Sequence, residues 1–519
     1  MFRNILSVGG LTLLSRLAGF VRDVVMAAVL GAGPVADAFL IAFRLPNHFR
    51  AIFAEGAFNA AFVPTYARLR EQDGVPVARG FADEILTAMT LVHAVLLALA
   101  LGFTPQFVGL LAPGLADDPE RFGLAVTLTR ITFPYLALIS VATLVTGALN
   151  ASDRFAVAAA APILLNICMV STLLAAALFP TAGHAAAWGV LISGVAQLFV
   201  VGLDAERHGI GLRFARPKLD PGTRQFLKAL GPAIIGSAGV QIALFADTII
   251  ATFLPAGALS ALYYADRINQ LPIGVVGIAV GTVLLPEMSR RLAAKDDAGA
   301  AHSQARAIEL ATLLAIPFVA AALLVPDLTM RALFARGAFT AADAADAAAT
   351  LRAYGVGLLA FVVVRAFIAP FHARGDTRTP MIASLTAVAL NVALKFALMG
   401  TLAQVGLALA TAVGGWINVS LLVLFAIRRG YPVGDAALGR HLAKLFVLLI
   451  LVGAALVGAQ ALAAALLPPS LWAREEIMLL LVVIAGAAVY GGGLFVLLGR
   501  SFLAGVMGRR GPRPDSMPR

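Results

Sequence analysis

Cysteine and charge are scarce in this chain of 519 residues. Its single cysteine, Cys168, lies in an apolar run, which excludes an internal disulfide and fits a small packing residue. Charged residues make up 13% of the chain and hydrophobic residues 60%, and the mean hydropathy is +0.91. A soluble globular protein carries roughly 25% charged residues. The composition therefore excludes an ordinary soluble domain and indicates a polytopic membrane protein.

Sequence patterns of catalysis and metal binding are also missing. The chain has no GxGxxG, Walker A or HExxH pattern, and its seven histidines are scattered without metal-ligand spacing. A membrane phosphatase or glycosyltransferase acting on polyprenyl pyrophosphate needs clustered acids, or a nucleophile with a base, near the membrane face. We find no such cluster. The sequence predicts a protein that is not an enzyme, with no metal site and no cofactor.

Long apolar segments are what the chain does contain. A membrane span needs about 20 helical residues, and charged or Pro/Gly-rich breaks separate fourteen such segments. They are expected near residues 4–30, 34–66, 78–109, 120–149, 157–179, 184–205, 226–254, 258–288, 304–325, 343–371, 379–400, 404–427, 441–467 and 475–499. The first carries arginines and lacks a small-residue cleavage site, so we expect a retained helix and not a secretory signal.

Basic residues gather in alternate connections between these segments, for example over 207–228, 290–295 and 500–513. By the positive-inside rule both termini are expected in the cytoplasm, which agrees with an even number of spans. The net charge of +11 is therefore interpreted as an orientation signal with contacts to anionic lipid. Nucleic acid is not an expected partner.

The chain contains an internal duplication with an offset near 223 residues. The aligned pairs are Gly33 with Gly257, Pro64 with Pro286, Arg130 with Arg352, Asp153 with Asp376 and Asn166 with Asn391. We interpret 1–220 and 221–430 as two six-helix lobes related by a pseudo-two-fold axis along the membrane normal. Residues 431–519 add two further transmembrane helices and a basic cytoplasmic tail. Parallel repeats of this kind are typical of transporters that alternate access to a site between the lobes, although similar hydropathy alone is the competing explanation.

Seven charged residues fall within the first two apolar segments. They are Arg16, Arg22, Asp23, Asp37, Arg44, Arg50 and Glu55. An arginine facing lipid at mid-bilayer costs roughly 2.5 to 3.5 kcal/mol, so these side chains are expected to face a watery cavity. Helical spacing places Asp37, Arg44, His48 and Glu55 on one stripe, and Pro46 is expected to bend the helix so that Arg50 approaches it.

Two interpretations of these charges remain open. Arg16–Asp23 and Arg44–Asp37 could be internal ion pairs of the bundle. However, four arginines face three acids, and a surplus guanidinium suits a phosphate or pyrophosphate because its planar fork matches those oxygens and keeps its proton.

The second half carries further charges inside apolar helices. Asp266 and Arg267 fall in the segment that corresponds to the one with Arg44, so the cavity would be cationic from both lobes. Asp247 and Lys395, with the nearby Asn391, form either a buried ion pair or a coupling site for a cation or proton.

Several runs give the chain a family resemblance. SRLAGFVRDVVMAAVLGAG, ADAFLIAFRLPNHFRAIFAEGAFNAAFVP, PAIIGSAGVQIALFADTIIATFL, YYADRINQLPIGVVGIAVGTVLLP and the GAFT at 337–340 resemble the MurJ (MviN) family of bacterial lipid II flippases. The resemblance implies a fourteen-helix fold of the multidrug/oligosaccharidyl-lipid/polysaccharide exporter superfamily. It also implies a substrate, undecaprenyl-pyrophosphate carrying a disaccharide-pentapeptide, which moves from the cytoplasmic to the outer leaflet of the bacterial inner membrane for peptidoglycan synthesis.

The resemblance also implies roles for individual residues. The family's functional arginines match Arg16, Arg22, Arg50 and Arg267, and its acidic positions match Asp23, Asp37 and Glu55. Two positions depart from it. Ala51 stands where some members have a second arginine, and Lys395 stands where some relatives offer an acid, so an ammonium there would substitute for a coupling cation.

From these matches we expect lipid II, membrane lipids and cell-wall synthesis proteins as partners, and coupling to the membrane potential or to a monovalent cation. Three alternatives stay open. An exporter of another lipid-linked oligosaccharide would share the fold, a drug or cation antiporter would have an acidic and aromatic cavity, and a non-transporting scaffold would not need intramembrane charges.

Overall fold

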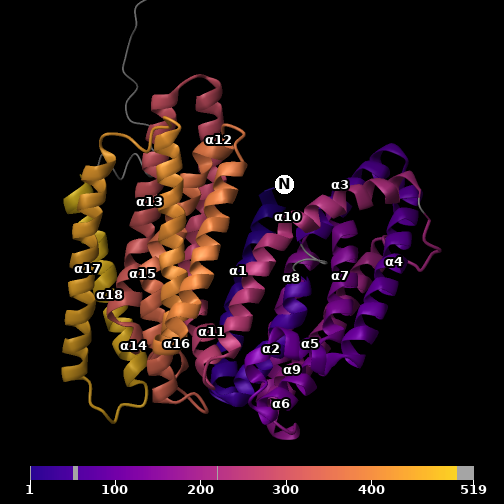
Figure 1. Cartoon of the computed structure of the whole chain (residues 1–519), viewed down its shortest axis with the longest axis horizontal. Coiled ribbons are helices and arrows are strands. Elements are labelled where there is room, and N and C mark those ends of the chain that lie inside the picture. Colours follow the sequence, from indigo (N-terminus) through magenta and orange to yellow (C-terminus); the bar gives the residue numbers. More distant parts are fainter. Residues whose placement is uncertain (1, 51–55, 219, 500–519) are drawn as a thin grey trace, which may run out of the picture. The chain divides into compact units, whose positions relative to one another are not determined.

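The computed structural model describes residues 2–50, 56–218 and 220–499. All regular secondary structure in these ranges is helical, which confirms the predicted all-α class. Nine helical stretches in these ranges, with Pro119–Asn150 counted as one, are long and apolar enough to cross a membrane. The chain forms two compact units, of which the first is Met1–Ser260 with Arg336–Thr340 and the second is Ala261–Ala335 with Ala341–Arg519 (Figure 1).

The first unit is built from ten α-helices. They are α1 (Phe2–Leu30), α2 (Pro34–Arg50), α3 (Gly56–Gln72), α4 (Val75–Gly102), α5 (Thr104–Leu111), α6 (Pro119–Thr132), α7 (Pro134–Asn150), α8 (Ala156–Leu174), α9 (Ala182–Arg207) and α10 (Pro221–Thr252). Proline stands in the first turn of α4, α5, α6, α7 and α10. A proline there starts a helix at no cost, because that N–H has no intrahelical partner.

Aromatic side chains form the core between α3, α4 and α10. The Phe62 ring lies 5.6 Å from the Phe81 ring and 5.3 Å from the Phe58 ring, both in stacked geometry. Phe226 of α10 meets all three edge-on at 5.6 to 6.4 Å. All four rings are buried, so each contributes a large apolar area together with favourable ring geometry.

A short segment distant in sequence completes the first unit. The Ala338 N–H donates to the Ala28 carbonyl at the end of α1, with an N···O distance of 2.7 Å. Gly31 and Gly337 have φ values of 68° and 60°. A Cβ on Gly337 would lie 2.3 Å from the Ala28 oxygen. Only glycine satisfies both the left-handed backbone and this close approach.

The second unit contains the remaining helices. They are α11 (Ala258–Pro272), the π-helical η4 (Ile273–Gly277), α12 (Ile278–Ala293), α13 (Asp297–Leu324), α14 (Pro326–Phe334), α15 (Ala341–His372), α16 (Arg378–Arg428), α17 (Leu438–Leu466), α18 (Arg474–Gly493) and the π-helical η5 (Leu494–Leu498). α11 begins three residues before the boundary of the unit. α13 and α15 pack together, and α16 packs on α15.

The last two helices are joined to this unit by an apolar core. Leu445, Leu448 and Val452 of α17 are buried against Leu313 and Ile316 of α13, and Met478 and Val482 of α18 belong to the same cluster. α17 and α18 therefore pack as a pair on α13 and α14.

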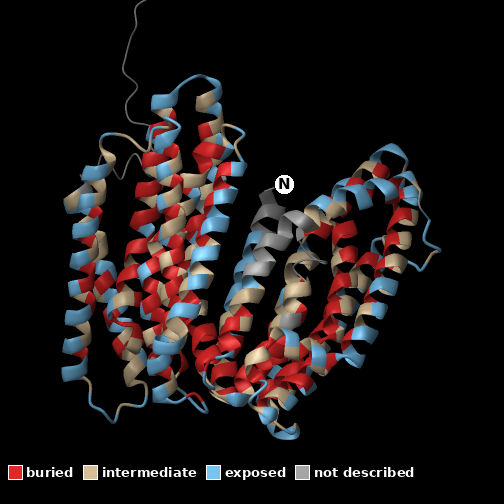
Figure 2. Ribbon diagram, in the orientation of Figure 1, coloured by how far each residue is buried: buried red, intermediate tan, exposed pale blue. Residues whose placement is uncertain are grey.

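Large apolar side chains face outward on several helices, where Figure 2 shows pale blue along the ribbon. Leu91, Val92 and Val95 of α4 are more than half exposed, as are Phe446 and Ile450 of α17. Such continuous apolar surface is unfavourable in water and is typical of a lipid-facing helix. The described part of the chain therefore has the character of a polytopic membrane protein.

The helix limits differ from the predicted segments at several places. The predicted run 34–66 appears as α2 and α3, with residues 51–55 between them outside the described residues. The run 78–109 is divided at Phe103, and the run 120–149 at Phe133, one residue before Pro134. Conversely, α16 is one element with a break at Ala403 (φ 44°, ψ −127°), within the predicted gap between 400 and 404.

Candidate functional site

The charged residues of α1 occupy different environments. Arg16 is exposed, whereas Arg22 and Asp23 are buried at 7% and 3% exposure. Arg22 donates to the Asp23 carboxylate from Nε (3.1 Å) and from a terminal nitrogen (2.7 Å). Both guanidinium contacts reach one oxygen, Oδ1, so the adjacent residues form a compact buried ion pair.

Asn166 positions this part of α1 against α8. Its Nδ2 donates to the Ser15 carbonyl at 3.2 Å and to the Pro162 carbonyl of its own helix at 3.3 Å. Gly19 lies over the same amide, where an added Cβ would stay 3.8 Å away. The amide therefore fixes α1 about two turns before the Arg22–Asp23 pair.

Asp37 lies in the first turn of α2 and is completely buried. Its Oδ1 accepts hydrogen bonds from the Ser260 hydroxyl (2.6 Å) and the Ser260 N–H (3.0 Å). Its Oδ2 accepts from the Gly257 N–H (2.8 Å) and from a terminal guanidinium nitrogen of Arg121 (3.2 Å). Four donors thus satisfy both carboxylate oxygens, which is what a buried carboxylate requires.

This arrangement corrects the predicted position of Asp37 on a solvated stripe. The stripe follows from the spacing along one helix, but α6 and the connection between α10 and α11 cover the first turn of α2 and exclude water. The suggested Arg44–Asp37 pair is also wrong, because Arg121 supplies the guanidinium. We call Asp37, Arg121, Gly257 and Ser260 the Asp37 cluster.

Arg121 is a buried residue of this cluster that the sequence analysis did not identify, because its position is typical of a loop arginine. It lies in the first turn of α6 and is 8% exposed. Asp118, the N-cap of α6, accepts the Arg121 N–H at 3.1 Å, and its Oδ2 lies 3.8 Å from Arg121 Nε. The sequence signal is an arginine two residues after the Asp118-Pro119 helix start, in a first turn where acids such as Glu120 are preferred.

The far end of α2 is more open than its start. Arg44, His48 and Arg50 are partly exposed. The His48 ring lies 4.5 Å from the Phe245 ring of α10, and its Nε2 is 3.4 Å from the Thr248 hydroxyl. α2 runs as one helix through Pro46 to Arg50. Glu55 lies outside the described residues.

The charged residues predicted in the second half are divided between the units. Asp247 belongs to α10 of the first unit and is partly exposed. In the second unit the Arg267 guanidinium lies over the Tyr263 ring, 4.6 Å from its centroid, which favours a cation through the ring quadrupole. Asp266 accepts a hydrogen bond from the Gln270 amide one turn later.

Asn391 and Lys395 lie in the first part of α16. Lys395 is 2% exposed and Asn391 is partly buried. The Asn391 side chain meets Gly414 of the same element after the Ala403 break, where an added Cβ would lie 3.0 Å from Asn391 Cβ. The two parts of α16 therefore pack closely at Asn391.

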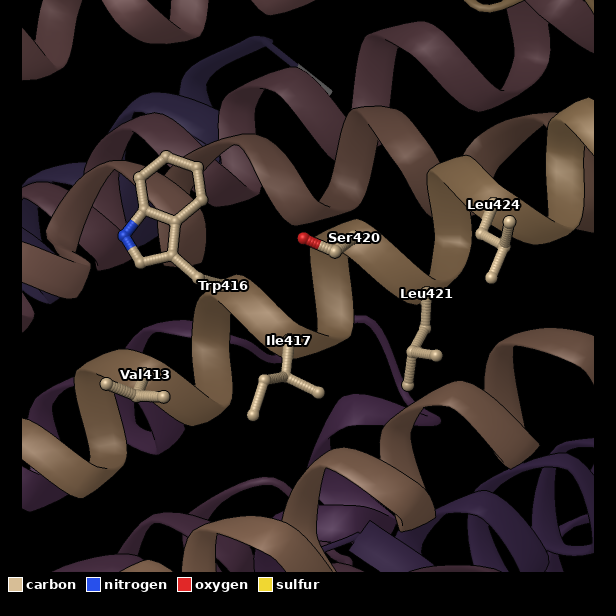
Figure 3. Close-up of a pocket in the computed structure, with 6 residues that line it drawn as sticks. All are labelled: Val413, Trp416, Ile417, Ser420, Leu421 and Leu424. Atoms are coloured by element: carbon tan, nitrogen blue, oxygen red, sulfur yellow. The ribbon is translucent and has the colours of Figure 1, made fainter.

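An apolar hollow of about 320 Å³ lies along the later part of α16. Figure 3 shows its lining residues, which are Val413, Trp416, Ile417, Ser420, Leu421 and Leu424. The Trp416 indole N–H is directed to the Val356 carbonyl of α15 at 2.8 Å. No ionisable group lines the hollow, so it does not suit a charged headgroup. Within the described residues no group of three His, Cys, Asp or Glu side chains is placed to hold a metal.

Comparison with known proteins gives the family. A family model described as "Lipid II flippase MurJ" matches residues 26–474. The chain belongs to the MurJ family. A relative in Rhizobium meliloti (strain 1021), named "Probable lipid II flippase MurJ", is 43% identical over 463 residues, which cover 88% of this chain and 86% of the relative. A relative in Burkholderia cenocepacia, named "Lipid II flippase MurJ", is 34% identical over 441 residues, which cover 83% of this chain and 84% of the relative.

Solved structures agree with the MurJ fold. A lipid II flippase MurJ in an inward closed conformation superposes with a TM-score of 0.78 at 24% identity and covers 96% of this chain and 99% of that one. An inward-facing multidrug resistance MATE transporter of the MOP superfamily superposes with a TM-score of 0.66 at 15% identity. It covers 82% of this chain and 97% of that one. Members of the MurJ family are named as flippases, which are transporters and not catalysts. The roles of the individual charged residues stay predictions.

Proposed function

We propose that this chain is a lipid II flippase, which moves undecaprenyl-pyrophosphate-linked peptidoglycan precursor from the cytoplasmic to the outer leaflet by alternating access. The observation that carries the proposal is the family match over residues 26–474. The proposed location is the bacterial inner membrane, with fourteen spans arranged as two six-helix lobes plus α17 and α18, and with both termini in the cytoplasm. The alternation of basic connections supports this orientation.

Arginine is proposed to hold the diphosphate. Arg16 is exposed, and Arg50 and Arg267 are partly exposed, so these guanidinium groups are accessible to an anion. A guanidinium offers two parallel donors to phosphate oxygens and stays charged in a low-dielectric site. Arg22 is held by Asp23 in the structure, and we propose that the diphosphate competes with this carboxylate for Arg22 during the cycle.

The membrane potential is the proposed energy source. It is worth roughly 2.3 kcal/mol per elementary charge per 100 mV, and a positively charged site would respond to it when the substrate has left. Asp247, Asn391 and Lys395 are the proposed coupling residues. The ammonium of Lys395, buried in α16, would take the place of a bound cation. Collapsing the potential across proteoliposomes should slow flipping, and an unchanged rate would contradict this step.

Depletion with complementation tests the function in cells. The native gene is shut off, and lipid II in the cytoplasmic leaflet is measured while variants are expressed at equal levels. Wild type should clear the accumulated lipid II, and Arg16→Ala, Arg22→Ala, Arg50→Ala and Arg267→Ala should not. Arg130→Ala, which removes an exposed arginine of α6 outside the proposed site, is the matched control and should clear it.

Two outcomes would overturn the proposal. If lipid II does not accumulate on depletion while another lipid-linked oligosaccharide does, the chain exports that other substrate. If cells fail to divide or elongate although lipid II reaches the outer leaflet normally, the chain acts as a scaffold for cell-wall synthesis proteins.

A further inference from the structure

A second polar site lies inside the first unit and is lined by residues other than the proposed substrate arginines. A cavity of about 230 Å³ opens where the end of α3, the start of α4, the turn between α7 and α8, and the end of α9 meet. Its polar lining consists of Tyr66, Arg70, Arg79, Ser152, Arg154 and His208. One molecule of liquid water takes about 30 Å³, so the cavity has room for a phosphate group with several waters.

The charge of this cavity is strongly positive. Arg70, Arg79 and Arg154 each bring a guanidinium, and none of the three forms an ion pair with a described carboxylate. Two acids lie nearby. Asp204 Oδ1 is 3.4 Å from His208 Nδ1, and Asp83 stands one turn after Arg79 on α4. Its Oδ1 accepts the Arg213 N–H at 2.7 Å. Three like charges around one cavity repel one another, and an anion between them would relieve that repulsion.

Several of these groups are held in place by contacts outside the cavity. One terminal nitrogen of Arg70 donates to the Ala151 carbonyl at 3.0 Å. The Arg154 N–H bonds to the Leu149 carbonyl at 3.0 Å, which closes the turn after α7. The Nδ1 of His208 lies 2.8 Å from the Asp204 carbonyl. These contacts orient the Arg70 guanidinium and the His208 ring, so binding a ligand costs less side-chain ordering at those two residues.

The donors match one ligand chemistry. Guanidinium forks pair with phosphate oxygens, and hydroxyl groups from Tyr66 and Ser152 add neutral donors. We propose that this cavity is a binding site for a phosphate group, held by Arg70, Arg79 and Arg154. The phosphate comes either from the headgroup of an anionic phospholipid or from a free phosphate ion. The proposal does not depend on lipid II transport, because none of its residues belongs to the proposed substrate set.

Titration calorimetry on the purified full-length protein in an uncharged detergent tests the site. The probes are inorganic phosphate and the short-chain lipid dihexanoylphosphatidylglycerol, at matched ionic strength, with dihexanoylphosphatidylcholine as the uncharged counterpart. Arg79→Gln and Arg154→Gln remove one guanidinium each from different walls of the cavity. Arg216→Gln removes an exposed arginine from the connection between α9 and α10 and is the control. Unchanged elution from a sizing column and an unchanged unfolding temperature show that each variant is folded.

We expect saturable binding of at least one anionic probe. Each cavity variant should weaken it about tenfold, the effect of one hydrogen bond to a charged group, and Arg216→Gln should leave it unchanged. Binding of inorganic phosphate identifies a site for the free ion. Binding of the phosphatidylglycerol without inorganic phosphate identifies a lipid-headgroup site.

Three results would overturn the proposal. The first is that neither anionic probe binds. The second is that the phosphatidylcholine binds as tightly as the phosphatidylglycerol. The third is that the folded cavity variants bind as the wild type does, or that Arg216→Gln weakens binding as much as they do. Since Arg79 and Arg154 are tested separately, one misfolded variant leaves the other to decide. Failure here leaves the flippase proposal intact, because the depletion experiment involves none of these residues.

Discussion

The Asp37 cluster makes a quantitative prediction about stability. Asp37→Ala removes the acceptor of four hydrogen bonds and leaves the Arg121 guanidinium buried, with Asp118 at 3.8 Å as its one remaining carboxylate neighbour among the described residues. Breaking a buried ion pair by removing one partner costs about 3 to 5 kcal/mol. We expect a loss of about 3 kcal/mol in the free energy of unfolding, at the low end of that range because Asp118 still compensates part of the charge.

Two milder substitutions in the same cluster separate charge from hydrogen bonding. Asp37→Asn keeps an oxygen for the Ser260 donors but loses the charge, so we expect a loss of about 1.5 to 3 kcal/mol. Ser260→Ala removes only the 2.6 Å hydroxyl contact and leaves the Ser260 N–H bond to the carboxylate. Its expected cost is about 1.5 kcal/mol.

Equilibrium unfolding of the purified protein in mixed micelles, followed by tryptophan fluorescence, measures these losses. A double-mutant cycle between Asp37→Ala and Arg121→Ala should give a coupling energy of about 1 to 3 kcal/mol. The reasoning is refuted if Asp37→Ala costs no more than Ser260→Ala, or if the cycle gives a coupling below about 0.5 kcal/mol.

The other predictions concern a backbone contact and an acid-sensitive contact. Gly337→Ala should destabilise the protein by about 1 to 3 kcal/mol or more, because φ is 60° and the new Cβ would meet the Ala28 oxygen at 2.3 Å. Gly33→Ala is the control. It should be nearly neutral in the same unfolding assay, because nothing lies within 4 Å of a Cβ added there. Partial burial acts to raise the pKa of Asp435, but hydrogen bonds from His302 and the Ala437 N–H, together with Arg306, outweigh it and lower that pKa. A carboxyl group whose pKa is lowered by folding stabilises the fold at pH values above its usual pKa of about 3.9. This stabilisation is lost as the pH falls from that value through the lowered pKa. Asp435→Asn should therefore reduce stability at pH 7 and flatten its decline in acid, and an equally steep decline in the variant would contradict this assignment.

The helical class and most helix positions follow from the sequence because length and hydropathy are local properties. The break near residue 403 is an example, since Gly400, Thr401 and Gln404 interrupt the apolar run there. The divisions at Phe103 and Phe133 are harder to predict, because the apolar run resumes on both sides of each position and Pro105 and Pro134 are the helix-start signals that follow them.

The partners of the buried charges could not be predicted, because each depends on contacts between distant helices. Arg121 is 84 residues from Asp37, and its position after an Asp-Pro helix start reads equally well as a solvated loop. Ser260 is 223 residues from Asp37, which is the offset of the predicted repeat. The predicted duplication did not include this pair, and aligned residues need not touch, so only the fold brings Asp37 and Ser260 together. Arg22 and Asp23 show that prediction also fails locally. Consecutive residues point in different directions on a helical wheel, but the long Arg22 side chain bends to reach the Asp23 carboxylate.

Flipping of lipid II by the reconstituted protein tests the central claim most directly. The purified chain is placed in proteoliposomes with lipid II, and the fraction of lipid II that reaches the opposite leaflet is measured with an external probe over time. Wild-type protein should move lipid II across the bilayer, Arg50→Ala and Arg267→Ala should reduce the rate at least tenfold, and Arg130→Ala should not. Flipping at the wild-type rate by both arginine variants would contradict a diphosphate held by these guanidinium groups.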